Sequence, residues 1–252
     1  MMRVKFLMLL TFCLGIFSNA QKVSVEILDS ETAFKLNDFY NPINIKYSIK
    51  NNTSDNVYFI LDKNSFGVFA TPNHYYFGEN ASTKLSLDEK VFNPRLLLFD
   101  SNNLRDTLEL NIPRIHYLVE ELGRLQSIQE KIDDDSLNVL KTYKDKFYKT
   151  KSLNWVVRAK YINDNIIFLK PFEEIIVNTK VDFRNYYYDK ISKTGIGYLL
   201  ENKNYKMQIK IYNNPVINEY LSEANRKKIK ELNVVLIDQI IFSNKTHLIV
   251  SK

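Results

Sequence analysis

The stretch Pro42-Ile43-Asn44-Ile45-Lys46-Tyr47-Ser48-Ile49-Lys50 indicates the fold class of this 252-residue chain. Its apolar residues occupy every second position, with amide, lysine and serine side chains between them. Successive side chains of a strand point to opposite faces, so the alternation predicts an antiparallel strand with one buried and one solvated face. Residues 51–56, rich in Asn, Asp and Ser, predict a turn, and Val57 to Leu61 resume the strand pattern.

Similar short apolar runs, bounded by Asn, Asp, Gly or Pro, occur on both sides of this stretch. Many short strands with frequent turn signals are typical of a β-sandwich or barrel, so we expect a mainly β protein. The further predicted strands are Val23–Ile27, Phe66–Ala70, Tyr75–Phe77, Leu85–Leu87, Arg95–Phe99, Ile166–Leu169, Ile175–Phe183, Tyr198–Leu200, Tyr205–Ile211, Val234–Phe242 and His247–Val250.

The middle of the chain has a helical period. From Ile115 to Ile132 apolar residues recur every three or four positions, which predicts an amphipathic helix with Pro113 near its start. Residues 133–136 interrupt this pattern and can cap a second helix. The apolar side of that second helix is Leu137, Leu140, Tyr143 and Phe147. We therefore expect a helical hairpin, about residues 113–161, inserted among the strands.

Two segments are less clear. Residues 148–161, which include Trp155, fit either a continued helix or a strand. Residues 216–232 predict a short helix with the basic run Arg226, Lys227, Lys228 and Lys230. Such a run is typical of a solvated helix face, and it can also contact anionic headgroups or an acidic partner.

The N-terminus predicts a secretory signal peptide over residues 1–20. Arg3 and Lys5 precede an apolar run from Phe6 to Phe17, which ends at the small residues Ser18-Asn19-Ala20. The run is shorter than the roughly 20 residues that a membrane-spanning helix needs, and no later stretch is long enough. We expect cleavage after Ala20, export to the periplasm or the medium, and one domain over residues 21–252.

Composition excludes several kinds of chemistry. Cleavage would remove the one cysteine, Cys13, and with it any disulfide or thiolate site. Residues 21–252 keep 33 basic groups, since Arg3 and Lys5 are lost from 35, against 29 acidic groups. This net charge of +4 is modest and dispersed, and we expect no nucleic-acid partner. The sequence contains no phosphate-binding, dinucleotide-binding, serine-hydrolase or zinc-protease motif, so we expect no cofactor and no metal.

Three features resemble the immunoglobulin-like sandwiches of exported bacterial proteins: the strands Ile43–Ile49 and Val57–Leu61, the strand that begins Tyr205-Lys206-Met207, and Ser243-Asn244-Lys245 before the last strand. The resemblance implies an immunoglobulin-like antiparallel β-sandwich, here with an inserted helical hairpin and therefore α+β overall. It also implies that Tyr205 forms a tyrosine corner, with its hydroxyl bonded to nearby backbone, and that Met207 stands where antibody domains have their second cysteine. The chain departs from the pattern in lacking a cysteine pair and a Trp on the presumed third strand.

Two aromatic runs are candidate partner-binding sites: Tyr75-Tyr76-Phe77 and Tyr186-Tyr187-Tyr188. Three consecutive rings on a strand cannot all enter one core, because neighbouring side chains point to opposite faces. Rings left at the surface would suit a protein or sugar partner. The alternative is that a second sheet face or the helical insertion covers them.

These observations predict an exported noncatalytic binding or structural module of the cell envelope. Its partner, a protein or glycan, would contact the helical insertion and the aromatic loops. One alternative is an exported hydrolase whose site is assembled from distant residues, with His74, His116 or His247 as the base. Another is an inhibitor or immunity-type protein with one tight partner. The sequence leaves the oligomeric state open.

Overall fold

Strand β3 (Ile43–Asn51) forms where the sequence alternates most regularly. Ile45, Tyr47 and Ile49 on its inner face are at most 1% exposed, which confirms the predicted buried face. The strand lies between β1 (Val23–Ile27) and β8 (Glu174–Val181) and is antiparallel to both. We call this three-stranded sheet, ordered β1-β3-β8, sheet A.

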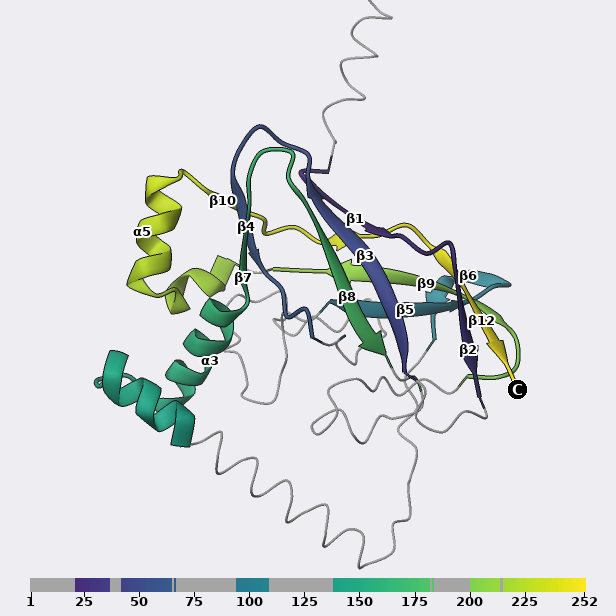
Figure 1. Ribbon diagram of the computed structural model, residues 1–252, viewed down its shortest axis with the longest axis horizontal. Coiled ribbons are helices and arrows are strands. Elements are labelled where there is room, and N and C mark those ends of the chain that lie inside the picture. Colours follow the sequence, from purple (N-terminus) through teal and green to yellow (C-terminus); the bar gives the residue numbers. More distant parts are fainter. Residues whose placement is uncertain are drawn as a thin grey trace, which may run out of the picture.

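The computed structural model describes residues 21–36, 42–64, 66, 94–108, 138–181, 183, 200–213 and 215–252. Within these residues the protein is mainly β, with antiparallel and mixed sheets and a few short helices (Figure 1). The remaining elements are β2 (Glu31–Lys35), β4 (Val57–Ile60), β5 (Arg95–Asp100), β6 (Asn103–Thr107), α3 (Leu153–Asp164), β7 (Ile166–Leu169), β9 (Asn204–Ile211), the 3-10 helix η2 (Pro215–Tyr220), α5 (Glu223–Glu231), β10 (Val235–Leu236), β11 (Ile241–Phe242) and β12 (Thr246–Ser251). Residues 138–147 are also helical.

Two further sheets complete the β structure. Sheet B has the order β2-β12-β9-β5-β6, with β11 also paired to β9. Its pairs are antiparallel except for β2 with β12, which are parallel. Sheet C has the order β10-β4-β7, in which β4 is parallel to β10 and antiparallel to β7.

The chain passes between sheets A and C at two adjacent turns, which follow β3 and β7. Residues 51–56 connect β3 to β4, and residues 170–173 connect β7 to β8, side by side in Figure 1. Asn51, which is 0% exposed, joins the two turns. Its Nδ2 donates to the carbonyl of Asp55 at 2.7 Å and to that of Lys170 at 2.8 Å, and its Oδ1 accepts from the backbone N–H of Thr53 at 3.0 Å.

Strand β4 separates two hydrophobic cores. Val57 and Phe59 belong to the main core, which side chains from sheets A, B and C share. Tyr58 and Ile60, on the other face, belong to a second core formed with α3, η2 and the segment around α5. Because both faces of β4 are covered, all four of its residues are buried. The second core therefore fixes the helices to the outer side of sheet C.

Some of the strands and helices predicted from the sequence are confirmed, and others are wrong. The strand Val234–Phe242 is in fact two short strands, β10 in sheet C and β11 in sheet B. The helix predicted over residues 216–232 is broken between η2 and α5, where Ser222 caps α5 by accepting from the N–H of Asn225. Strands β2 and β6 have no clear pattern in the sequence. Residues 148–161, whose pattern fits either a helix or a strand, mostly belong to α3.

Other predictions fall outside the described residues. They include the signal peptide, the first helix of the predicted insertion and most of the strand candidates at 66–70, 75–77, 85–87 and 198–200. The described part of the insertion consists of the helix at 138–147 and α3, which extends to Asp164. Among the described residues, no helix has the length and apolar character required to cross a bilayer.

Candidate interaction surface

The described helices of the predicted insertion are joined by a short turn that positions their aromatic side chains. The N–H of Tyr148 donates to the carbonyl of Lys144 at 2.7 Å, and the N–H of Lys151 donates to that of Tyr148 at 3.0 Å. Ser152 then caps α3 by accepting from the N–H of Trp155 at 3.2 Å. The turn therefore ends one helix and begins the next within a few residues.

Five aromatic rings form a continuous row across these elements. Ring centroids lie 5.0 Å apart for Phe147 and Tyr143, 5.7 Å for Tyr143 and Tyr148, and 5.0 Å for Tyr148 and Trp155. The row ends at Tyr220 of η2, 5.7 Å from Trp155. These tilted and edge-on arrangements are favourable because they bring ring edges against ring faces. We call Tyr143, Phe147, Tyr148, Trp155 and Tyr220 the aromatic row.

The row runs from the second core to the surface. Tyr220 is 5% exposed, and Trp155 packs against the core that η2 and α3 share. At the other end, Phe147 is 56% exposed and Val139, two helical turns before it, is 57% exposed. Val139, Tyr143 and Phe147 are spaced by four residues and so lie on one side of their helix. On this side of the helix, the apolar side chains of Val139 and Phe147 are exposed to solvent.

Lysine ammonium groups lie close to three of these rings. Lys146 Nζ is 5.1 Å from the ring centroid of Phe147, and Lys151 Nζ is 4.9 Å from that of Trp155. Lys160 Nζ is 5.6 Å from the ring of Tyr143 and also forms an ion pair with Asp164. Within about 6 Å a cation is attracted to the negative face of an aromatic ring. The aromatic row therefore has lysine ammonium groups directly beside its rings.

Basic side chains are frequent in this segment. Residues 138–160 contain one acidic side chain, Asp145, and seven basic ones: Lys141, Lys144, Lys146, Lys149, Lys151, Arg158 and Lys160. This net +6 exceeds the +4 of residues 21–252, so the rest of that range sums to −2. A sliding count of charge along the sequence would have found the segment, whereas a total over the chain hides it.

Burial and neighbouring groups shift the pKa of one tyrosine in the aromatic row, Tyr148. Burial is the main cause that raises the pKa of the Tyr148 hydroxyl above its ordinary value. Tyr143 and the carboxylate of Glu223 raise the pKa further, and the guanidinium of Arg226 opposes them. Tyr148 therefore stays neutral at physiological pH. Glu223 and Arg226 belong to α5, so that helix contributes one charge of each sign near the row.

The structure describes two of the eight residues singled out from the sequence. Tyr75, Tyr76, Phe77, Tyr186, Tyr187 and Tyr188 lie outside the described residues. Tyr205 and Met207 are 1% and 0% exposed on β9, where they pack in the main core. In the sequence, Tyr143 and Phe147 fall on the apolar side of a predicted helix, and Trp155 falls in a segment that fits either a helix or a strand.

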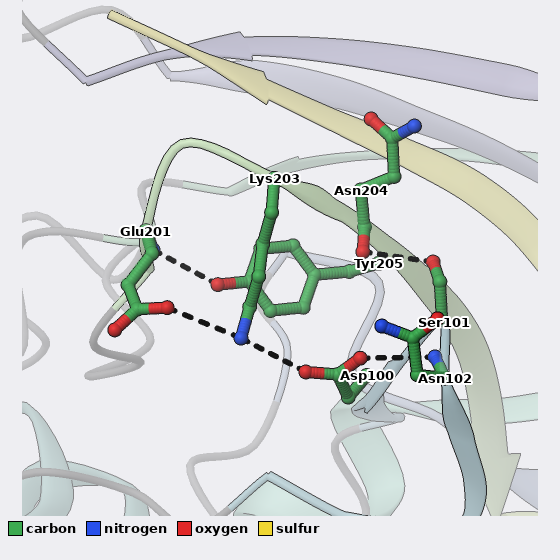
Figure 2. A network of polar contacts seen from close by, with 7 residues as sticks. All are labelled: Asp100, Ser101, Asn102, Glu201, Lys203, Asn204 and Tyr205. Atoms are coloured by element: carbon green, nitrogen blue, oxygen red, sulfur yellow. Dashed lines mark hydrogen bonds and ion pairs between the residues drawn. The ribbon is translucent and has the colours of Figure 1, made fainter.

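Tyr205 belongs to a polar network between the start of β9 and the turn after β5 (Figure 2). Its hydroxyl accepts from the backbone N–H of Glu201 at 2.9 Å. Lys203 Nζ lies 2.8 Å from Asp100 and 3.1 Å from Glu201, and 5.4 Å from the Tyr205 ring (Figure 2). The hydrogen bond from Lys203 lowers the pKa of Asp100, and hydrogen bonds to Asp100 and then Glu201 raise the pKa of Lys203. The two ion pairs and the Tyr205 hydrogen bond connect the end of β5 to the segment that begins β9.

Tyr161 and Asp62 form a second polar contact, partly buried between α3 and the end of β4. The Tyr161 hydroxyl donates to Asp62 Oδ2 at 3.3 Å, and Asp62 Oδ1 accepts from the N–H of Asn64 at 2.9 Å. Burial, followed by the charge of Asp62, raises the pKa of Tyr161. The phenol is therefore a stable donor to the carboxylate, and the contact holds α3 against the chain that leaves sheet C.

The hydrolase alternative depends on three histidines, most of which lie outside the described residues. Of the three histidines only His247 is described, and it lies exposed on β12 beside the ammonium of Lys206. No group of three or more His, Cys, Asp or Glu residues in the described ranges is arranged to hold a metal ion. His74 and His116 lie outside those ranges, so the hydrolase alternative stays a prediction.

Comparisons with models of protein families, with curated proteins and with solved structures found no match to this chain.

Proposed function

We propose that the protein is an exported noncatalytic binding or structural module of the cell envelope. It contacts a protein or glycan partner through its helical insertion and its aromatic loops. The observation that carries this proposal is the aromatic row, which extends from a rigid core at Tyr220 to solvent at Phe147. Aromatic side chains supply large contact areas at low entropic cost, and a row anchored at one end is preorganised for binding.

The proposed fold of the module is an immunoglobulin-like sandwich formed by sheets A and B. Two observations support it. Side chains from the two sheets share one core. The hydroxyl of Tyr205 also bonds to the backbone four residues upstream, as a tyrosine corner requires. The proposed location is outside the cytoplasm, because residues 1–20 have the charge, apolar run and small-residue ending of a cleaved signal.

Capture of envelope components by the purified protein tests the proposed function. The full chain is expressed with its own N-terminal segment and purified from the compartment that it reaches, and mass spectrometry determines whether it begins at residue 21. Captured proteins and glycans are identified, purified and titrated against the protein. Trp155 is the one tryptophan of the chain and lies within the aromatic row, so its fluorescence reports binding directly.

Variants connect binding to the row. The double variant Tyr143→Ala with Phe147→Ala should weaken binding about 10- to 100-fold, because central aromatic residues dominate interface energies. Phe242→Ala is the matched control, since Phe242 is a 44% exposed aromatic on β11, away from the helices. Equal binding by both variants, or a purified protein that retains residues 1–20 inside the cell, would contradict the proposal.

A further inference from the structure

The apolar side of the helix at 138–147 and the lysines beside it form one surface with two kinds of chemistry. Its members are Val139, Tyr143, Lys146, Phe147, Lys151 and Trp155, which we call the lysine–aromatic surface. In Figure 1 this helix lies beyond α3, on the side away from sheets A and B. We propose that the lysine–aromatic surface binds the anionic phospholipid surface of a membrane and holds the protein there by its helical end.

The charge distribution favours a polyanionic surface as the ligand. Residues 138–160 carry net +6, whereas the rest of residues 21–252 sums to −2. A protein with a basic segment orients that segment toward negative charge and approaches it faster. Each Lys or Arg near an anionic membrane strengthens binding, and the charges act together over a distance of about one Debye length.

The basic residue types of the segment suit a membrane surface. Six of the seven basic residues in 138–160 are lysines. Lysine is depleted at protein–protein interfaces, and its compact, hydrated ammonium lacks the planar fork with which arginine pairs to a carboxylate. A membrane surface needs no such geometry, because its charge is spread over many mobile headgroups.

The exposed apolar side chains suit the apolar layer below lipid headgroups. Val139 and Phe147 are more than half exposed and have no hydrogen-bonding group to offer a sugar hydroxyl. Helices that lie in a membrane interface place such residues below the headgroups and keep lysines at the headgroup level. Tyr143 and Trp155 are of the residue types that are enriched at membrane–water interfaces.

This inference does not depend on the proposed function. A protein that captures no envelope protein or glycan can still bind lipid vesicles, and a protein that captures such a partner can fail to bind them. The two proposals therefore fail in different experiments. The aromatic row is common to both, and its single tryptophan reports on either ligand.

Flotation of the full exported protein with lipid vesicles tests the inference. Vesicles of phosphatidylglycerol and phosphatidylethanolamine in equal amounts are compared with vesicles of phosphatidylcholine alone. We expect the protein to float with the anionic vesicles, to dissociate as salt is added, and to remain free of the neutral ones. Trp155 emission should shift to shorter wavelength on binding, and lipids brominated on the acyl chain should quench it.

Matched charge variants locate the surface. Lys146→Gln with Lys151→Gln removes the two ammonium groups that lie over Phe147 and Trp155, and should weaken vesicle binding about 30-fold. Lys227→Gln with Lys230→Gln removes the same charge from α5, where both lysines are exposed, and should change binding less than about threefold. Phe147→Ala should reduce the Trp155 shift. Circular dichroism and a cooperative melt establish that each variant folds.

Three results would overturn the inference: equal binding to anionic and neutral vesicles, no binding to either, or equal losses in the two lysine pairs. Displacement of the protein from vesicles by a soluble polyuronate at equal charge concentration would assign the surface to an acidic glycan. A purified acidic protein that competes with the vesicles and loses affinity in the Lys146 and Lys151 variant would assign it to a protein.

Discussion

At the scale of single residues, buried amides determine how the chain turns. Asn51 lies where the chain leaves β3, and its side chain bonds to its own turn and to the neighbouring turn after β7. A backbone group would reach one partner, whereas the amide offers two donors and an acceptor. The Asn51 side chain therefore holds the two turns together at the point where the chain passes from sheet A to sheet C.

Asn51→Ala should lower the free energy of unfolding by about 2–3 kcal/mol, because the buried amide loses its bonds to the partly buried carbonyls of Asp55 and Lys170 together. Asn52→Ala is the control. The adjacent amide is exposed and makes a bond of 3.1 Å to the carbonyl of Gln21, so its loss should cost less than about 0.5 kcal/mol. Urea titration measures both values, and similar costs for the two would contradict the role of Asn51.

Phe172 adopts a conformation that an L-residue avoids. Its φ is 60°, in the left-handed region, and the N–H of Glu173 donates to the carbonyl of Lys170 across this turn at 3.1 Å. The turn has Pro171 before the residue with positive φ, a position that ordinarily favours Gly. Phe172 is 62% exposed, so little burial offsets the strain.

Phe172→Gly should therefore raise the free energy of unfolding by about 0.5–1 kcal/mol, since glycine adopts positive φ without the steric penalty of a Cβ atom. Phe172→Ala separates this effect from loss of the ring, because alanine keeps the Cβ and should give no gain. Thermal melts of the three proteins measure the difference. A gain of equal size in the alanine variant would show that the exposed ring, and not φ, is unfavourable.

At the scale of elements, Asn163 joins three helices. From α3 its Nδ2 donates to the carbonyl of Tyr220 at the end of η2, at 2.9 Å. Its Oδ1 accepts from the N–H of Ser222 at 2.8 Å, and Ser222 caps α5. One side chain therefore hydrogen-bonds to backbone groups at the end of η2 and at the start of α5, where these groups lack partners within their own helix.

Asn163→Ala should lower the free energy of unfolding by about 2–3 kcal/mol, because several partly buried backbone and side-chain groups lose a partner together. Ser222→Ala, which removes only the cap of α5, should cost about 1 kcal/mol. The Asn163 variant should also change Trp155 emission, since Trp155 packs against Tyr220. Equal costs for the two substitutions would show that Asn163 contributes no more than the cap.

At the scale of the whole molecule, buried tyrosines make stability sensitive to alkaline pH. Burial is the largest cause that raises the pKa of Tyr47, Tyr58 and Tyr161 above the ordinary value of 10.0. Asp62 raises it further for Tyr47 and Tyr161, and Arg226 opposes the shift at Tyr58. The folded state therefore favours the neutral phenols.

The stabilisation from these neutral phenols is fully present below pH 10.0, the ordinary tyrosine value, and is lost as pH rises toward the raised folded-state values. Above pH 10.0, each of Tyr47 and Tyr161 should lower the free energy of unfolding by about 1.4 kcal/mol per pH unit. Melting temperatures between about pH 8 and about pH 11 test this. Tyr47→Phe with Tyr161→Phe should flatten the decline, and an unchanged slope would assign the alkaline loss to other groups.

The sequence by itself determined where the chain forms strands with a buried face. Alternation of apolar and polar residues predicted β1, β3, β4, β8 and β9, because a period of two appears directly in the order of residues. Short apolar runs predicted β5, β7 and β12. Neither pattern predicted β2 or β6, the two edges of sheet B. Edge strands bury little and carry polar side chains, as in Glu31–Lys35 with only Phe34 buried, so their alternation is weak.

Only the tertiary structure decided which strands pair and which surfaces stay exposed. Val234–Phe242 reads as one strand, yet its two ends bond to β4 and β9 in different sheets, because partners distant in sequence offer the free hydrogen-bonding groups. The aromatic row is likewise a product of packing, since Tyr220 meets Trp155 through the second core. Periodicity reports how each residue is buried, whereas pairing and surface composition depend on contacts between distant segments.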